Sequence, residues 1–157
     1  KGIDLLLEAV KDFPKDKIGK LTIAGLSMMK IDLPKTDFPI HLLQKWLSEE
    51  ELQKLLLEHD VLILPYREAS QSGVVTLGTA AVIPMVVTKV GGLPEQLNEA
   101  EAIWVEPEPD SIRDGILKLI ENSELYKEIH QKLRAKSSKE DNQKIAQQLM
   151  DLFQDLQ

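Results

Sequence analysis

The chain has 157 residues, which is enough for one domain with a hydrophobic core, and its 43% hydrophobic and 29% charged residues are ordinary for a soluble globular protein. A net charge of -7 argues against a general nucleic-acid binder, and the absence of cysteine excludes a disulfide scaffold, a Cys-based zinc site and thiol catalysis. Aromatic residues make up only 4% of the chain, which argues against a sugar site built on stacked rings.

The first part of the chain alternates between helical and extended patterns. Apolar residues recur at helical spacing from Ile3 to Val10, and Phe13-Pro14 ends this helix. Short apolar runs predict strands at 20–24 and 39–43. Between them we expect a loop with a helical turn around 27–30.

The middle of the chain carries the strongest pattern. Ser48 and Glu51 have the spacing of a capping box and predict the start of a helix. The apolar runs 60–66 and 83–88 are typical of strands buried on both faces. The small residues of 68–81 predict a polar loop and a helix packed close to the sheet.

The last part of the chain is mostly helical. The Gly-rich segment 89–95 predicts a turn, with its proline in the first turn of a short helix. A short strand at 102–105 follows, and Asp110 is expected to cap a helix that runs to Glu121. Two further amphipathic helices are expected over 123–135 and 139–156.

Strands that alternate with helices predict an α/β fold of Rossmann-like type, with a parallel sheet covered by helices on both faces. Residues 1–157 form a single domain in this interpretation. The first predicted element is a helix with no strand before it, which suggests a fragment of a longer protein that lacks its first strand. Open parallel sheets bind ligands beyond the carboxyl ends of their strands, so the loop after 60–66 is the candidate site.

Gln71-Ser72-Gly73 leads from that loop into a helix. The first N–H groups of a helix have no partner within it, and they suit a diphosphate. Ser72 could equally be a simple cap, with Gly73 easing helix packing. Lys89 to Gly92 also follows a strand and precedes a helix, so it is either a second anion-facing turn or a tight connection.

Metal and cofactor sites are not predicted. His41, His59 and His130 have no second ligand at a suitable spacing, and each has a structural or solvent-exposed interpretation. We therefore predict no metal site and no cofactor.

Four stretches in order resemble one known family. Lys1-Gly2-Ile3-Asp4 is similar to its "KGID" helix start, and 21–25 to its "L-IAG" strand. Residues 47–66 resemble "VSDEEL…ADVFVLPS", and 72–95 resemble "FGLV…KPVVAT-VGGLPE". The chain thus resembles the C-terminal, donor-binding half of GT-B fold glycosyltransferases of family 4, glycosyl transferases group 1.

The resemblance implies a set of donor-binding residues. Lys1 would hold the donor diphosphate together with an arginine that lies upstream, outside this chain. Main-chain N–H groups of Gly73 and Val74 would meet the phosphates and the sugar. Gly25 would border the crevice, and Trp46 and Leu47 would lie beside the nucleobase.

The donor loop departs from the family pattern. The family usually carries two glutamates spaced E-x7-E, and the matching positions here are Ser70 and Gly78. Some members have a neutral loop similar to Ala69-Ser70-Gln71-Ser72-Gly73-Val74. In that variant Gln71 and Ser72 supply hydrogen bonds in place of the first glutamate, with Glu68 as a nearby substitute.

The resemblance implies a retaining glycosyltransferase that moves a sugar from a nucleotide-diphosphate donor to a glycan or lipid-linked acceptor, in surface polysaccharide or glycoconjugate synthesis. The acceptor would be held by an N-terminal domain outside this chain, no general base is visible, and the chain alone should transfer nothing. The expected location is the cytoplasm, with peripheral membrane contact left open. Two alternatives stay open: a catalytically silent nucleotide-sugar-binding or regulatory module, and, more weakly, a GT-B-like sugar-nucleotide epimerase.

Overall fold

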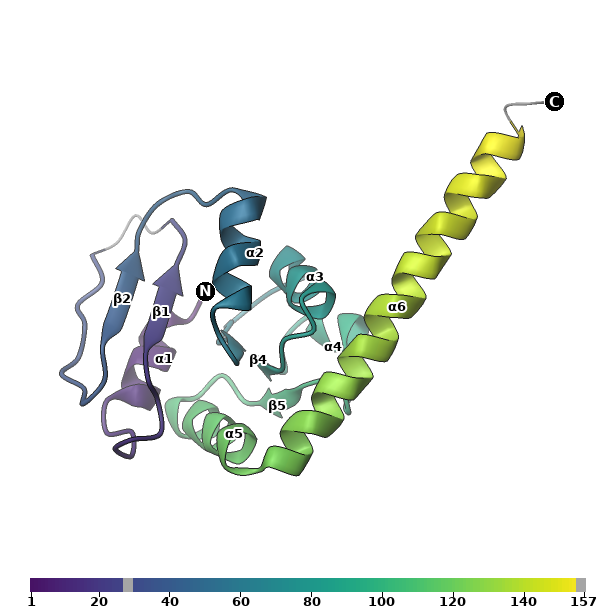
Figure 1. Ribbon diagram of the computed structural model, residues 1–157. Helices are drawn as coiled ribbons and strands as arrows, with labels where there is room; N and C mark the ends of the chain where they lie inside the picture. Colours follow the sequence, from purple (N-terminus) through teal and green to yellow (C-terminus); the bar gives the residue numbers. More distant parts are fainter. Residues whose placement is uncertain (27–29, 155–157) are drawn as a thin grey trace.

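The computed structural model describes residues 1–26 and 30–154 and shows alternating strands and helices (Figure 1). The expected helical turn around 27–30 therefore lies largely outside the described residues. The elements are α1 (Ile3–Val10), β1 (Leu21–Ala24), β2 (Ile40–Leu43), α2 (Glu49–Leu57), β3 (Leu62–Leu64), α3 (Gly73–Ala80), β4 (Met85–Thr88), α4 (Leu93–Gln96), β5 (Ile103–Val105), α5 (Pro109–Glu121) and α6 (Ser123–Gln154).

The strands form two parallel groups. β1 pairs with β2, and β4 lies between β3 and β5. In Figure 1, α1 and α5 lie on one side of the strands, and α2 and α3 lie on the other. The parallel α/β architecture with helices on both faces is confirmed, and one hydrophobic core joins both strand groups.

β4 is the most buried strand, with all four of its residues inside the core. Two helices approach the strands through glycine. A Cβ atom on Gly78 of α3 would lie 2.8 Å from Leu62 Cδ2 and 2.9 Å from Met85 Sδ. Gly115 of α5 faces Val105 in the same way. The absence of a side chain at these positions lets each helix pack close to the strands.

The capping box predicted for α2 is confirmed. Ser48 Oγ accepts the N–H of Glu51, and the Glu51 carboxylate accepts the N–H of Ser48. His59, just beyond this helix, joins it to β1. Its Nδ1 donates to Leu55 O at 2.7 Å, and its Nε2 meets Thr22 Oγ1 at 2.8 Å, so this histidine has a structural role.

Two predicted helix boundaries are wrong. Asp110 does not cap α5, because the helix begins at Pro109 and the carboxylate of Asp110 instead accepts Arg113 Nη1 at 3.2 Å. The two helices predicted after residue 122 are one continuous helix, α6. No proline or glycine interrupts it, and Ser138 Oγ donates to Arg134 O within the helix, which allows a serine in its interior.

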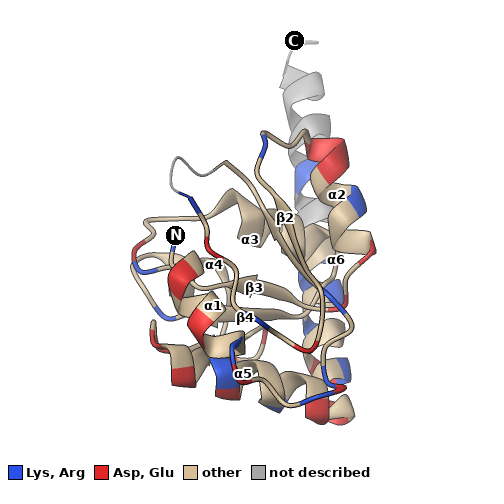
Figure 2. Cartoon of the chain, turned by 90° about the vertical axis from the view of Figure 1, so that its left-hand side faces the viewer, with Lys and Arg blue, Asp and Glu red and all other residues tan. Residues whose placement is uncertain are grey.

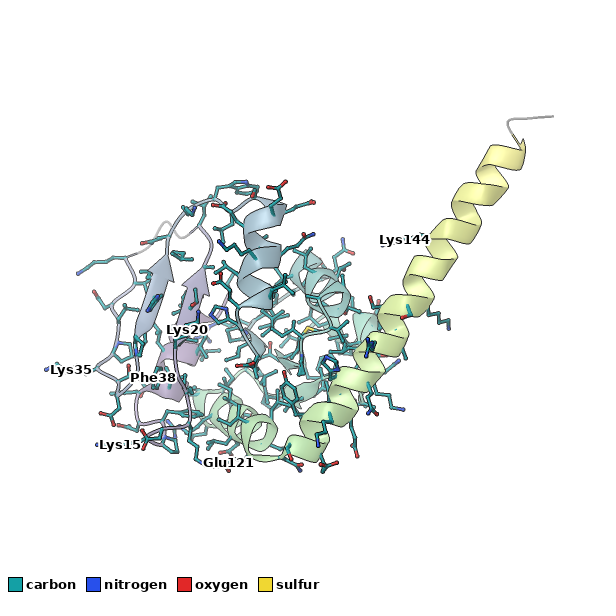
Figure 3. All side chains as sticks on the ribbon, viewed as in Figure 1. Lys15, Lys20, Lys35, Phe38, Glu121 and Lys144 are labelled. Carbon is teal, nitrogen blue, oxygen red and sulfur yellow. The ribbon has the colours of Figure 1, made fainter. Side chains whose placement is uncertain are left out.

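Long side chains reach outward from the body of the protein, as Lys15 and Lys35 show in Figure 3. Acidic and basic residues alternate over the outer helices (Figure 2). None of the helices in the described part of the chain is long and apolar enough to span a bilayer.

A buried ion pair attaches α6 to the loop between α4 and β5. Lys136 Nζ lies 2.9 Å from Glu101 Oε2, and Glu101 also accepts the N–H and the side-chain amide of Asn98. Burial alone would raise the pKa of Glu101, but the hydrogen bonds from Lys136 and Asn98 outweigh it and hold the pKa below its ordinary value.

A lowered carboxylate pKa stabilises the fold only while the carboxylate is ionised. The stabilisation by Glu101 is therefore full above its ordinary pKa of 4.5 and is lost as the pH falls through the lowered value. We expect Glu101→Gln to cost about 2 kcal/mol at pH 7, because Lys136 loses its carboxylate partner. The gap in melting temperature between this variant and wild type should narrow between pH 5 and pH 3, and a constant gap would contradict this account.

Candidate functional site

The candidate site lies where β3 ends and the chain turns into α3. Thr88 of the neighbouring strand β4 fixes this turn, because its buried hydroxyl lies 2.7 Å from Tyr66 O and 3.2 Å from Leu64 O. The hydroxyl holds the chain at the last residue of the strand and two residues beyond it. The position of the loop is thus set by a polar side chain of the neighbouring strand.

Ser72 is the N-cap residue of α3, but its side chain does not cap the helix. Its Oγ meets the hydroxyl of Tyr66 at 3.3 Å, and only 5% of the residue is exposed. Its N–H donates to Gln96 Oε1 at 2.7 Å, and its carbonyl accepts Gln96 Nε2 at 3.1 Å. The polar groups of Ser72 are therefore engaged inside the protein.

Gly73 is the first residue of α3 and faces open space. A Cβ atom on Gly73 would have no heavy atom within 4 Å. Its N–H and that of Val74 are first-turn donors, which have no carbonyl partner within a helix. This geometry leaves room for a ligand to approach the main chain at the positive end of the helix.

Lys1 comes to the same place from the other end of the sequence. Gly2 has a φ of 72° and packs directly on the carbonyl of Pro65, where any Cβ atom would collide with the oxygen. This contact places Lys1 Nζ 4.3 Å from the centre of the Tyr66 ring. Tyr66 therefore lies between the ammonium group of Lys1 and the start of α3 at Ser72.

The Gly-rich turn after β4 packs against the main chain of the loop at Ala69 and Ser70. Gly92 N–H donates to Ala69 O at 3.0 Å, and a Cβ atom on Gly91 or Gly92 would collide with the carbonyl oxygen of Ala69 or Ser70. Of the two interpretations of this turn, a tight connection describes its geometry. Its glycines let two backbones meet.

The other predicted residues of the loop are open to solvent. Glu68, Ser70 and Gln71 are exposed, so their side chains are available to a ligand. Arg67 forms an ion pair with Asp4 of α1, and its hydrogen bond lowers the pKa of that carboxyl group. This pair joins the loop to α1, the helix that begins two residues after Lys1.

Three predicted residues follow the strands of the other group. Gly25 ends β1 with open space on its Cβ side. Trp46 follows β2 and is 79% exposed, whereas Leu47 beside it is buried. Lys45 pairs with Glu51 of α2 at 2.6 Å and so fixes this loop. Trp46, and not Leu47, presents an apolar surface that a ligand could cover.

Gly78, which matches the second family glutamate, lies inside the protein. Leu62 and Met85 occupy the space where its side chain would begin. The position thus serves helix packing, and a carboxylate there would be buried between apolar side chains.

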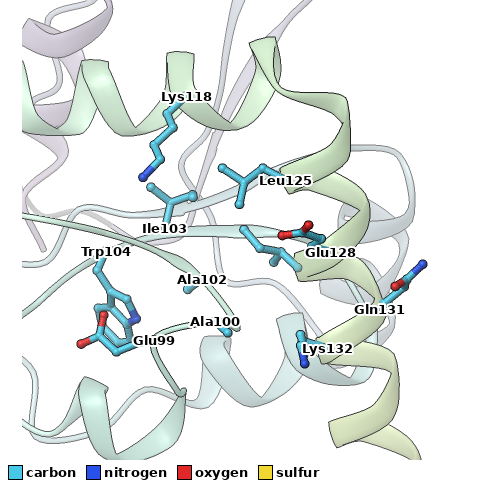
Figure 4. A pocket seen from close by; sticks show the side chains of 11 residues that line it. Glu99, Ala100, Ala102, Ile103, Trp104, Lys118, Leu125, Glu128, Gln131 and Lys132 are labelled. Carbon is cyan, nitrogen blue, oxygen red and sulfur yellow. The ribbon is translucent and has the colours of Figure 1, made fainter.

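A cavity of about 390 Å³ lies elsewhere, between β5, α5 and α6 (Figure 4). Trp104, Lys118, Glu128 and Lys132 are among its lining residues, and Glu99 lies beside Trp104 in Figure 4. None of the ten predicted donor residues lines this cavity. The cavity is therefore separate from the candidate site.

Comparisons with known proteins agree with the fold. Residues 1–122 match the family model of glycosyl transferases group 1. Two Methanocaldococcus jannaschii proteins are similar to this chain. Uncharacterized glycosyltransferase MJ1607 is 33% identical over 128 residues, which cover 76% of this chain and 33% of that protein. Uncharacterized glycosyltransferase MJ1178 is 32% identical over 132 residues, which cover 81% of this chain and 37% of that protein. The chain thus spans about a third of the length of these relatives.

A solved structure shows the same fold. The Anabaena protein HepE, crystallised with UDP-glucose, superposes with a TM-score of 0.71 at 16% identity, over 96% of this chain and 45% of that one. The fold is a Rossmann-like domain of GT-B type. The chain belongs to the glycosyl transferases group 1 family.

The residues that organise the site were not all predictable. Tyr66, Thr88 and Gln96 contact the loop but were not singled out from the sequence. A threonine at the end of an otherwise apolar strand was an available signal for Thr88. The contact of Gln96 spans 24 residues and has no local signature.

The two glutamate positions of the family should respond differently to replacement. Gly78→Glu should lower the free energy of unfolding by about 3 kcal/mol, because it forces a carboxylate against Leu62 and Met85. Ser70→Glu is the matched control and should change stability by less than about 0.5 kcal/mol, because Ser70 is exposed. Urea unfolding of both variants would measure this, and equal stability would contradict the packing of α3 described here.

Proposed function

We propose that this chain is the donor-binding half of a glycosyltransferase that moves a sugar from a nucleotide-diphosphate donor to a glycan or lipid-linked acceptor, with retention at the anomeric carbon. The observation that carries the proposal is the open space beside Gly73 at the start of α3, together with the nearby ammonium group of Lys1. Tyr66 contacts both Lys1, through its ring, and Ser72, through its hydroxyl. The glycosyltransferase relatives and the UDP-glucose in the HepE structure support a nucleotide-sugar as the ligand.

The proposed chemistry is electrostatic. The bond between the anomeric carbon and the diphosphate oxygen breaks, the acceptor oxygen bonds to that carbon, and the proton of the acceptor hydroxyl passes to an oxygen of the departing diphosphate. Negative charge grows on the departing diphosphate. Lys1 and the N–H groups of Gly73 and Val74 would stabilise that charge, because fixed donors need no reorganisation during the reaction. Glu68, Ser70 and Gln71 would hold the sugar hydroxyls, and Trp46 would cover the base.

A strand from upstream residues would complete the domain. Within the described residues, β1 and β3 each have one edge that pairs with no strand, and they belong to separate groups. A strand that precedes α1 would end at the same edge as Pro65, because Gly2 packs there. A right-handed crossover through α1 would then place it beside β1, between the two groups. An N-terminal domain before it would hold the acceptor, and such a protein would act in surface polysaccharide or glycoconjugate synthesis at the cytoplasmic side of a membrane.

The second candidate function is a silent nucleotide-sugar-binding or regulatory module. One observation favours it: neither family glutamate position carries a carboxylate, and Gly78 is fully committed to packing. Donor binding without transfer by the full-length protein would decide for this module. On either function, we expect the 157-residue chain alone to show no turnover, since the proposed N-terminal domain would hold the acceptor.

Filling the space beside Gly73 should abolish donor binding without disturbing the fold. Gly73→Leu adds a side chain where no heavy atom lies within 4 Å, so the protein tolerates it but the phosphates do not. Gly19→Leu is the matched control, because the same open space surrounds Gly19. Calorimetric titration with UDP-, GDP- and ADP-glucose should show binding by wild type and Gly19→Leu and a loss of at least about tenfold in Gly73→Leu, which corresponds to 1.4 kcal/mol. Undiminished binding by Gly73→Leu would overturn the placement of the donor.

A further inference from the structure

Gln96 makes an unusual contact with the donor loop. It lies at the end of α4, and its side-chain amide reaches both polar main-chain groups of Ser72. Because an N–H only donates and a carbonyl only accepts, the orientation of the amide is fixed: Oε1 faces the N–H and Nε2 faces the carbonyl. A single side chain thus bonds Ser72 in the way that a neighbouring strand would.

This contact determines which donors the loop can offer. The N–H of Ser72 is used by Gln96, so the first free donors are those of Gly73 and Val74. Ser72 is held extended, with φ −137° and ψ 118°, which is the backbone form of an N-cap residue. Fixing this residue fixes the direction in which the next two N–H groups point.

The main chain of Gln96 is bonded to α6. Its main-chain carbonyl accepts a hydrogen bond from Lys136 Nζ at 2.6 Å, and the same ammonium group is paired with Glu101. The side chains of Lys136 and Glu101 are 21% and 10% exposed. The short helix α4 is therefore attached to α6 on one side and to Ser72 on the other.

We propose that Gln96 is a positioning residue for donor binding: its amide sets the direction of the Gly73 and Val74 N–H groups toward the donor phosphates. This inference rests on the proposed function and adds to it a residue from a different helix that touches no ligand. Losing both hydrogen bonds should weaken donor binding about tenfold, because the two N–H groups are then no longer held in the direction of the phosphates.

The contact itself can be tested without a ligand. Gln96→Ala removes both hydrogen bonds, and Gln131→Ala is the matched control, because Gln131 is an exposed glutamine of α6 that lines the other cavity. Amide hydrogen exchange followed by NMR should show that the protection of the Ser72 N–H is lost in Gln96→Ala and kept in Gln131→Ala. Retained protection in Gln96→Ala would overturn the inference at its first step.

Donor binding is then measured by calorimetry with UDP-, GDP- and ADP-glucose. Using whichever of these wild type binds, we expect about tenfold weaker binding by Gln96→Ala and unchanged binding by Gln131→Ala. Lost Ser72 protection with unchanged donor affinity would overturn the positioning role and leave the proposed function intact. Failure of wild type to bind any of the three would instead overturn the proposed function.

A conservative variant separates positioning from general destabilisation. In Gln96→Glu, one oxygen still accepts the N–H of Ser72, but the other can donate to the Ser72 carbonyl only when protonated. A second, smaller cavity is lined by Gln96 together with Glu95, Lys136 and residues of α3. Glu95, Lys136 and its partner Glu101 are common to both proteins, so comparison with wild type at each pH corrects for their titration. The affinity of Gln96→Glu relative to wild type should rise from pH 7 to pH 4, because this range crosses the ordinary pKa of a glutamic acid, about 4.3. An affinity that stays equally low at both values would overturn the hydrogen-bond argument.

Discussion

The segment from Pro65 to Ser72 has no regular structure, yet it must hold its main chain still, because the polar groups of a backbone need partners wherever it is placed. Four neighbours supply the restraint. The backbone of Gly2 packs on Pro65, the hydroxyl of Thr88 holds the carbonyl of Tyr66, and Gly92 donates to Ala69. Gln96 bonds Ser72 at the far end. These contacts at Pro65, Tyr66, Ala69 and Ser72 together fix the position at which α3 begins.

Glycine makes this arrangement possible at two contacts. Gly2 and Gly91 both have positive φ values and both press against a carbonyl oxygen, so a side chain at either position would separate the two segments. Gly73 has the opposite situation, with open space where its side chain would be. The same residue type thus closes the loop onto its supports at some positions and leaves it open to a ligand at another.

Much of the fold was predictable from local pattern, and the reasons are physical. The apolar runs predicted as strands at 60–66 and 83–88 contain the paired parallel strands β3 and β4, and the capping box of Ser48 and Glu51 formed as expected, because such signals act over a few residues. The end of one helix and the start of the next around 136–138 were misjudged, since an amphipathic pattern alone does not say where a helix stops.

The candidate site was predictable only in part. The position of the candidate loop after β3 followed from the order of elements. The family resemblance singled out Lys1, whose Nζ the structure places near Tyr66 of this loop. The supports of the loop did not, because the side chains of Thr88 and Gln96 each reach the loop from a residue 22 or 24 positions away in the sequence, with two hydrogen bonds each. The burial of Leu47 and of Gly78 likewise depends on tertiary packing, which sequence spacing does not report.

The central claim is that the start of α3 receives the donor phosphates. Two-dimensional ¹H–¹⁵N NMR during titration with UDP-, GDP- and ADP-glucose tests it most directly. The account predicts that, for the donor that binds, the amide signals of Gly73 and Val74 shift most. Shifts that instead gather around Trp104 and Lys132, at the cavity beside β5, would contradict it.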